Sequence, residues 1–203
     1  MQNRPNQRYE TTCGKVFWHS RSVAVAVTAF FTKISDPNNT FVPVVRRGPD
    51  SETEPGKFCL PCGYLDWDED GAHGARRELR EETGILIENY IRPPFNEVKS
   101  FPIFQCFYPY AGDEQAQPWM INSRPDMDNL QNITLYFGSH CIVEELPKVH
   151  RDFNEVKDEV TEIIWWNTKD LYIKHNHELK EIFAFNHEIR IRDFMRFLSR
   201  INK

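Results

Sequence analysis

The sequence lacks the dense cysteine framework of a small secreted protein. Its 203 residues contain five cysteines, an odd number scattered along the chain, whereas disulfide-stabilised domains carry compact, even sets. We therefore expect reduced thiols and a cytoplasmic location. Cys59 and Cys62 form a lone CxxC pair, with no second pair and no histidine at zinc-finger spacing. We favour packing over metal or redox use of this pair.

Long apolar segments and excess positive charge are also missing. The longest apolar run lies in SVAVAVTAFF, too short to span a bilayer. The first twelve residues, MQNRPNQRYETT, lack the apolar core of a signal peptide. The formal net charge of -5 disfavours general binding to a nucleic-acid backbone, although it leaves room for local basic patches. We expect no membrane contact and no nucleic-acid partner.

The composition fits one globular domain with extensions. The chain is 40% hydrophobic and 27% charged, and it is long enough to bury a core without disulfide or metal support. Residues 1–14 are polar and are predicted to form a flexible N-terminal segment. Residues 15–203 are predicted to form a single domain.

Hydrophobic patterning predicts a mixed α/β fold. Alternating and β-branched stretches predict strands at 15–34, 40–47, 58–65, 85–91, 100–108, 132–146 and 159–166. A Pro-, Gln- and Asp-rich connection at 109–129 is predicted to be an inserted loop. Helical spacing of Ile182, Phe185, Ile189, Phe194 and Leu198 predicts a C-terminal helix near 177–201. The order of elements favours a mixed sheet between helices.

One further helix is predicted within GYLDWDEDGAHGARRELREETGI, residues 63–85. Asp68 or Asp70 can cap its start, and Gly84 ends it. At 100° per residue, one sector about 80° wide collects four small or apolar side chains and predicts the core face. These residues are Ala72, Ala75, Leu79 and Thr83.

Three glutamates, Glu78, Glu81 and Glu82, occupy the adjoining sector of this helix. Like charges at this spacing repel by roughly 0.2–0.5 kcal/mol per pair. RRELREE alone also fits an ordinary solvated surface, but such a surface usually alternates signs. Convergent carboxylates, with Gly74 leaving space beside them, are what Mg²⁺ requires. Arg77 precedes Glu81 by four residues and can pair with it.

The spacing of these residues resembles the Nudix box without a mismatch. The matching positions are Gly63, Glu69, Arg77, Glu78, Leu79, Glu81, Glu82, Gly84 and Ile85. At background residue frequencies such a match arises by chance on the order of 10⁻⁸ per position. The surrounding elements resemble the Nudix α/β/α sandwich with a mixed β-sheet, over roughly 15–200.

The resemblance implies hydrolysis of a pyrophosphate bond in a nucleoside diphosphate linked to another moiety, with Mg²⁺ or Mn²⁺. It implies that Glu78, Glu81 and Glu82 are metal ligands, joined by the Gly63 carbonyl. Arg77 would hold a glutamate in place. Glu69 would support the metal ligands or bind the metal through water. One departure precedes the box, where Cys62 replaces the first of two adjacent glycines found in many members.

The base that activates water is not fixed by the box. Family members use either a box glutamate or a carboxylate on a later loop. The later candidates here are Glu155, Asp158, Glu159 and Glu162. DEVTEIIWW resembles the acidic stretch before a family strand that ends in Trp, so we favour Glu159.

The substrate is less well determined by the sequence. FAFNHEIRI, residues 183–191, resembles the start of a helix in the ADP-ribose-hydrolase branch, with Asn186 where Asp is usual. Arg46 and Arg47 are candidates to bind a phosphate, or plain surface cations. Trp119 is a candidate to stack a base, or an anchor for its loop. A homodimer, RNA 5′-end hydrolysis and a non-catalytic nucleotide sensor stay open, whereas no Cys/Glu constellation in the sequence supports isoprenoid diphosphate isomerisation.

Overall fold

The computed structural model describes residues 7–19, 23–51, 53–66, 69–91, 117–123, 132–150, 159–174 and 176–201. The strands are β1 (Gln7–Glu10), β2 (Val16–His19), β3 (Val23–Lys33), β4 (Asp36–Arg47), β5 (Phe58–Cys59), β6 (Cys62–Tyr64), β7 (Met120–Asn122), β8 (Ile133–Val143) and β9 (Val160–Asn167). The helices are α1 (Gly71–Thr83), α2 (Glu88–Ile91), α3 (Asp170–Ile173), α4 (Asn176–Ile182) and α5 (His187–Ile201).

Seven of these strands form one mixed sheet. β3 pairs in parallel with β8 along its whole length, from Val23↔Ile133 to Lys33↔Val143. β4 pairs antiparallel with β3, β5 and β9, and β6 pairs antiparallel with the start of β3. The central position of β3 explains its almost unbroken apolar sequence, because both of its faces are covered.

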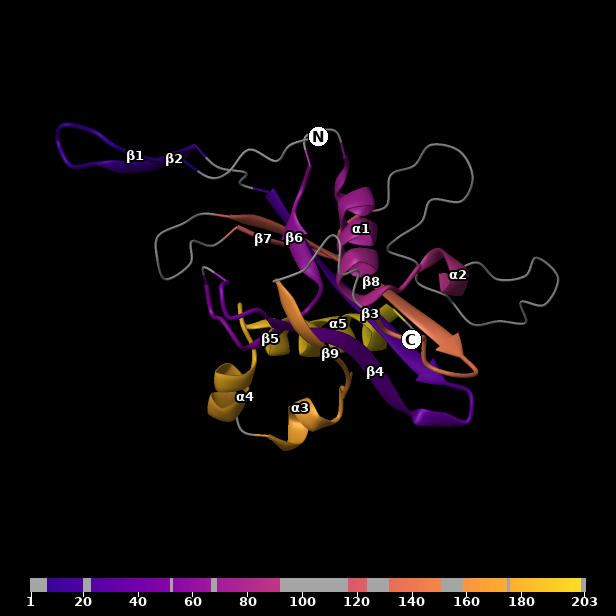
Figure 1. The fold of residues 1–203 in the computed structure, drawn as a ribbon. Helices are drawn as coiled ribbons and strands as arrows, with labels where there is room; N and C mark the ends of the chain where they lie inside the picture. Colours follow the sequence, from indigo (N-terminus) through magenta and orange to yellow (C-terminus); the bar gives the residue numbers. More distant parts are fainter. Residues whose placement is uncertain are drawn as a thin grey trace.

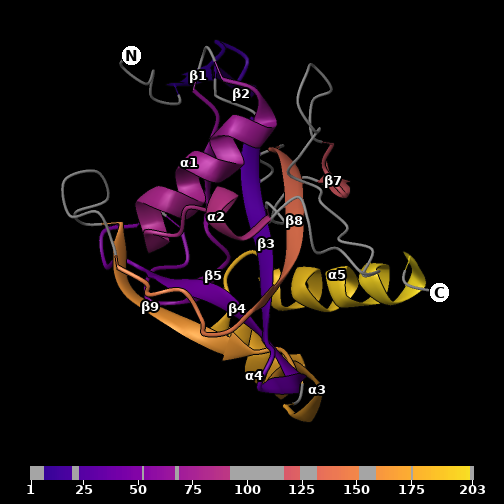
Figure 2. The same ribbon diagram turned by 90° about the vertical axis from the view of Figure 1, so that its right-hand side faces the viewer.

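Helices cover both faces of this sheet (Figure 2), with α1 on one side of β3 and β8 and α5 on the other. Alternate residues of β3 serve the two layers, as the period of two in a strand requires. Val25, Val27 and Ala29 pack with α1 in one core cluster, and Ala26 and Phe30 pack with α5 in the other. The predicted α/β/α sandwich with a mixed sheet is confirmed.

The helix α1 matches its prediction closely. Asp70 is the N-cap, and its carboxylate accepts hydrogen bonds from the amides of Ala72 and His73, each at 2.9 Å. Gly84 ends the helix with φ of 74°, a left-handed conformation that glycine adopts without strain. The predicted core face is confirmed, because Ala72, Ala75, Leu79 and Thr83 are all buried.

The two ends of the chain differ from prediction. Residues 7–10, expected within a flexible segment, form β1, which pairs with β2 in a separate hairpin that projects from the body (Figure 1). The single C-terminal helix is instead two helices, α4 and α5. They are separated because Phe183 bridges to Phe58 and the Ala184 amide donates to the Phe58 carbonyl at 2.8 Å.

The apolar stripe predicted for that helix is also partly wrong. Phe185 takes a φ of 58° in the turn between α4 and α5 and is 38% exposed, and Ile189 is 36% exposed. Phe194 and Leu198 are buried as predicted, and the stripe did not include Leu179 and Ile191, which are also buried. A turn inserted between two helices shifts the phase of the 3.6-residue repeat, so one continuous stripe could not describe both.

Two further segments differ in type. The predicted strand at 85–91 is a pair of buried isoleucines, Ile85 and Ile87, leading into the single turn of α2. Within the predicted loop at 109–129, Met120–Asn122 form β7, which pairs with β8. The predicted strand at 100–108 lies outside the described residues.

Candidate active site

Arg77 is the centre of the acidic face of α1. Its guanidinium donates to Glu69 at 2.6 Å, to Glu78 at 2.7 Å and to Glu81 at 3.1 Å, and also to the Tyr64 carbonyl at 2.9 Å. Burial opposes its charge, but these carboxylates raise the pKa of Arg77, so it stays protonated. The sequence predicted the pairing with Glu81, and the structure adds two more carboxylates to the same fork.

Glu78 lies under the strand that carries the box glycine. It is 8% exposed, and its carboxylate occupies the place where a Cβ on Gly63 would be. Glycine is therefore required at position 63 for close approach of this carboxylate to β6. Burial raises the pKa of Glu78 to about 7, with Arg77 opposing the shift and the charges of Glu81 and Glu159 adding to it.

Glu82 is held by a different partner. It is 6% exposed, and its Oε2 accepts a hydrogen bond from the Cys62 amide at 3.0 Å. Burial raises its pKa well above the usual range, and the nearby Cys62 thiol and Glu78 add to this shift. Glu82 thus ties the last turn of α1 to the loop that leads into Gly63.

The box carboxylates share a face but do not turn toward one point. Glu78 and Glu81 turn toward Arg77, whereas Glu82 turns toward the backbone of β6. The space predicted beside them at Gly74 is also filled. A Cβ on Gly74 would meet the side chain of Leu65 at 2.5 Å and the carboxylate of Glu69 at 2.9 Å. Gly74 therefore admits packing from the preceding loop rather than leaving room beside the carboxylates.

Glu69 accepts hydrogen bonds from a backbone amide and from a guanidinium. Its Oε1 accepts from the Asp66 amide at 2.9 Å as well as from Arg77. Burial tends to raise the pKa of Glu69, but the hydrogen bonds from Arg77 and Asp66 outweigh it and lower the pKa. Glu69 is therefore held both by Arg77 and by the backbone of the loop before α1.

The residues of this cluster fit a divalent cation. Glu69, Glu78, Glu81 and Glu82 carry four carboxylates, with Arg77 among them and Arg80 3.6 Å from Glu81. Glu78 and Glu82 have raised pKa values because their buried charges are under-compensated. Carboxylate oxygens are the donors preferred by Mg²⁺ and by Mn²⁺.

Of the two later candidate bases within the described residues, Glu159 and Glu162, Glu159 is the one whose charge acts on the box glutamates. It stands in an exposed turn directly before β9, and its charge raises the pKa of both Glu78 and Glu82. Glu162 is instead paired with Arg46 at 2.7 Å. Glu155 and Asp158 lie outside the described residues.

The two arginines at the end of β4 have different surroundings. Arg46 donates to Glu162 and to the Gly56 carbonyl, and its guanidinium lies 4.1 Å from the ring centre of Phe58. Arg47 donates to the Thr53 carbonyl at 2.9 Å, and its charge lowers the pKa of His187 and opposes the rise in the pKa of Cys62. The charge of Arg47 therefore acts on Cys62, the residue directly before Gly63 of the box.

Trp119 is packed against α5. Its indole N–H donates to Thr28 Oγ1 at 3.0 Å, and its ring lies 5.1 Å from Phe194 and 5.9 Å from Phe197, between centroids. These contacts agree with the interpretation of Trp119 as an anchor for its loop. Base stacking by Trp119 stays a prediction from the sequence.

Sequence reasoning did not single out Tyr136, His187 or Arg190. The charge of Arg190 lowers the pKa of His187 and opposes the rise in the pKa of Tyr136. Arg190 Nε is buried and has no hydrogen-bond partner in the described part of the chain. His187 and Arg190 both lie in FAFNHEIRI, a segment chosen for its resemblance and not for its cations, so a signal for them was present.

The model of one protein family covers most of the chain. The NUDIX domain model matches residues 21–185. The chain belongs to the Nudix family. The complete set of box glutamates and the match across the domain make it a Nudix pyrophosphohydrolase.

Solved Nudix structures share the fold of this chain at low sequence identity. The NUDIX domain of Shewanella oneidensis NrtR, complexed with ADP ribose, is 18% identical with a TM-score of 0.56, covering 94% of each chain. A bifunctional NMN adenylyltransferase/ADP ribose pyrophosphatase from Francisella tularensis, complexed with AMP and Mn ion, is 16% identical with a TM-score of 0.54. The match covers 86% of this chain and 41% of that one.

A third structure is a C. elegans Ap4A hydrolase binary complex, 14% identical with a TM-score of 0.52, covering 88% of this chain and 98% of that one. No curated protein sequence matches this Nudix chain significantly. Within the described ranges, no helix combines the length and apolar content needed to cross a bilayer.

Proposed function

We propose that this Nudix enzyme uses Mg²⁺ or Mn²⁺ to hydrolyse the pyrophosphate bond of a nucleoside diphosphate linked to another moiety, with ADP-ribose as the first candidate. The observation that carries the proposal is the pair of buried, under-compensated carboxylates, Glu78 and Glu82, beside Glu81 on one face of α1. An acidic pocket accepts a diphosphate only when cations lie between the two.

Divalent ions held there would polarise phosphoryl oxygens and lower the pKa of bound water. Glu78, Glu81, Glu82 and the Gly63 carbonyl are the proposed ligands. Arg77 orients Glu78 and Glu81 by donating to both of them from Nη1. Glu69 in turn fixes Arg77, so the acidic face is held before the substrate arrives.

Glu159 is the proposed base. Its carboxylate is exposed in the turn before β9, so it can exchange a proton with solvent, and its charge reaches Glu78 and Glu82. A base must lie within hydrogen-bond reach of the attacking water. The family also uses box glutamates for this step, so Glu81 is the alternative in this chain.

The cations proposed to bind the substrate are Arg47 and Arg190. They lie on β4 and α5, and the charges of both reach His187. A guanidinium binds phosphate oxygens with two parallel hydrogen bonds. The unpartnered Nε of Arg190 supports its use as a donor to an anion.

ADP-ribose is favoured because it is the bound ligand of one similar structure and part of the enzyme name of another. The Shewanella oneidensis domain is complexed with ADP ribose, and the Francisella tularensis protein is named an ADP ribose pyrophosphatase. The C. elegans protein is instead an Ap4A hydrolase. Since these identities are low, the substrate is to be decided by a panel of ADP-ribose, NADH, dinucleoside polyphosphates, nucleoside triphosphates and capped RNA.

The direct test combines this panel with Glu81→Gln. With Mg²⁺ or Mn²⁺ present, we expect the wild type to hydrolyse at least one small nucleotide of the panel. Glu81→Gln should lower kcat by about 10²–10⁴-fold, the range for loss of a positioned catalytic group. Glu144→Gln is the matched control, since Glu144 is exposed beyond the end of β8.

Four outcomes would count against the proposal. Full activity of Glu81→Gln would show that Glu81 has no role in catalysis. Activity unaffected by chelation of divalent ions would show that hydrolysis does not require a divalent cation. Turnover of capped RNA alone would select RNA 5′-end hydrolysis, and nucleotide binding without turnover of any substrate would select the sensor.

A further inference from the structure

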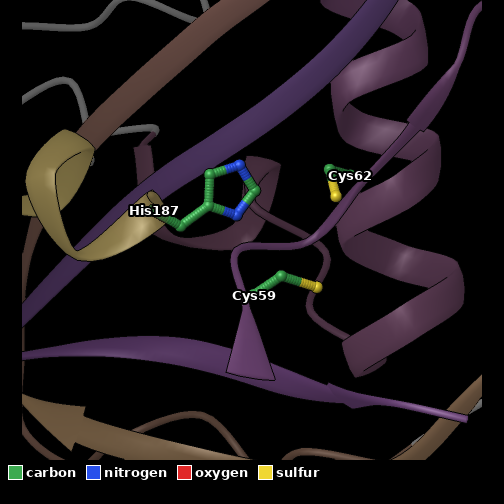
Figure 3. Close-up of side chains that lie close together, drawn as sticks. All are labelled: Cys59, Cys62 and His187. Atoms are coloured by element: carbon green, nitrogen blue, oxygen red, sulfur yellow. The ribbon is translucent and has the colours of Figure 1, made fainter. Parts of the chain in front are cut away.

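The CxxC pair and a distant histidine meet beside the box. Cys59 ends β5, Cys62 begins β6, and His187 is the first residue of α5. Their side chains gather around one turn (Figure 3), and their potential ligand atoms all lie within 4.8 Å of one another. Cys59 and His187 are buried and Cys62 is half-buried.

These three donors have the chemistry of a soft-metal site. Two thiolates and one imidazole suit Zn²⁺ or similar ions, whereas Mg²⁺ prefers oxygen. Zinc–ligand bonds place the donors of a tetrahedral site about 3.6–3.8 Å apart. The observed 4.8 Å limit therefore requires side-chain closure of about 1 Å, well within the range of rotation about χ1.

We infer that Cys59, Cys62 and His187 form a second metal site, which takes a soft divalent transition-metal ion of the Zn²⁺ type and is separate from the glutamates of α1. The fourth position is left to water or another donor. Binding displaces one proton from each thiol to solvent, and no electron is transferred. The site is independent of the proposed hydrolysis.

The state of His187 favours metal binding. Its Nδ1 accepts a hydrogen bond from the Leu60 amide at 3.0 Å, so in the neutral ring the proton is on Nε2. Nδ1 therefore points an unprotonated lone pair at the turn between the two cysteines, and a metal there would replace the Leu60 hydrogen as its partner. Burial, with the charges of Arg190 and Arg47, lowers the pKa of His187 to about 3 and keeps the ring neutral.

Charge balance also suits this set of donors. Two thiolates neutralise a divalent ion, so the complex adds no net charge beside Arg47 and Arg190. This matters because a buried uncompensated charge is costly. A site built only from neutral donors would place the full charge of the ion against these two arginines.

The site would join two segments that are distant in sequence, the CxxC turn and the start of α5. A shared ion would link the turn between β5 and β6 to the start of α5. One of its ligands, Cys62, directly precedes Gly63 of the box. The Cys62 amide already donates to Glu82, so the same turn contacts the acidic face of α1. The soft metal would thus be a structural clip at the edge of the active site.

The test uses Co²⁺ as the spectroscopic probe on the full chain, with thiols kept reduced. Thiolate ligation gives sulfur-to-cobalt charge-transfer bands in the near ultraviolet and intense tetrahedral visible bands, whereas carboxylate ligation gives neither. We expect both sets of bands to saturate at one equivalent of Co²⁺ and to be bleached by one equivalent of Zn²⁺. Cys59→Ser and Cys62→Ser should lose the charge-transfer bands.

Two control variants separate this site from the others. Cys141→Ser removes a buried thiol of β8 that packs in the α1 layer, and it should keep the bands. Glu81→Gln should also keep them, so failure of the hydrolysis proposal and failure of this one are distinguishable. His187→Asn retains an acceptor for the Leu60 amide but should weaken Co²⁺ binding.

Two results would overturn the inference. One is wild-type protein without charge-transfer bands under excess Co²⁺. The other is retention of these bands in both cysteine variants. Should those variants fail to fold, cadmium NMR of the wild type decides the question, since sulfur ligands shift the cadmium resonance far from the position given by oxygen ligands.

Discussion

The buried carboxylate of Glu78 depends on Arg77 to offset the cost of burying its charge. Glu78 is buried under Gly63, and Arg77 gives it one strong hydrogen bond while sharing the same guanidinium with Glu69 and Glu81. One cation divided among three carboxylates cannot fully offset burial. The raised pKa of Glu78 is the result. The ionised carboxylate that a cation needs is therefore the form that destabilises the folded protein when no cation is bound.

Replacing Glu78 by Gln should stabilise the protein in the absence of divalent ions at alkaline pH. The pKa of Glu78 rises from its ordinary value to about 7 on folding, so its ionised form destabilises the folded state above pH 7. The destabilisation disappears as pH falls toward the unfolded-state pKa. We expect Glu78→Gln to gain about 3 kcal/mol in unfolding free energy at pH 8, and little near pH 4.5.

Urea unfolding at several pH values with EDTA present measures this difference. Gln keeps an acceptor for Arg77, so the comparison isolates the charge. Saturating Mg²⁺ should narrow the gap at pH 8, because the ion stabilises the wild type more strongly. A gain that is equal at pH 4.5 and pH 8 would contradict the assignment of the effect to Glu78 ionisation.

The element α1 is defined at both ends by local chemistry. Asp70 satisfies two amides at its start, and Gly84 closes its end by donating to the Arg80 carbonyl at 2.7 Å. Local signals of this kind are readable in sequence, and both ends were predicted. The boundary between α4 and α5 is set instead by backbone bonds to β5, far away in the chain, and no local signal revealed it.

Gly84 and Gly56 form a matched pair for testing the C-cap. Both have left-handed φ values, 74° and 77°, but only at Gly84 would a Cβ meet a neighbour, the ring of His150. We expect Gly56→Ala to cost about 1–2 kcal/mol of unfolding free energy, the strain of a left-handed alanine. Gly84→Ala should cost more than this.

The extra cost at Gly84 should vanish in a His150→Ala background, because the clash is then removed. Thermal or urea unfolding of Gly56→Ala, Gly84→Ala, His150→Ala and the Gly84→Ala/His150→Ala double variant gives the unfolding free energies to compare. Equal costs for Gly84→Ala and Gly56→Ala in the wild-type background would show that His150 moves aside freely, contrary to this prediction.

The whole domain is organised around β3. This strand sends Val25, Val27 and Ala29 to the α1 layer and Ala26 and Phe30 to the α5 layer. The two layers therefore share one backbone, and neither can be lost without exposing the other face of the sheet. We expect cooperative unfolding of the sandwich as one unit.

Leu79→Ala in the α1 layer and Phe194→Ala in the α5 layer should each lower the unfolding free energy by about 2–5 kcal/mol, because both side chains are fully buried. Each should shift one common transition. Tryptophan fluorescence and far-ultraviolet circular dichroism should give the same midpoint for each variant. Leu86→Ala is the control, since Leu86 is 47% exposed and should change little.

Two separated transitions, or a midpoint that differs between the two probes, would contradict the shared role of β3. The control also has a defined failure. A loss of several kcal/mol in Leu86→Ala would mean that the exposure of Leu86, which precedes α2, is a poor guide to its contribution to the unfolding free energy.

The sequence by itself determined the acidic helix, its two ends, its core face and the family, because caps, periodicity and the spacing of the box are local properties. It also indicated the mixed α/β class. The two-sided core and the break before α5 depend on contacts between segments far apart in the chain. Only the tertiary structure decided that Arg77 serves three carboxylates and that His187 reaches the CxxC turn. Both depend on where β6 and α5 place their residues against α1 and β5, and no spacing along one segment encodes that distance.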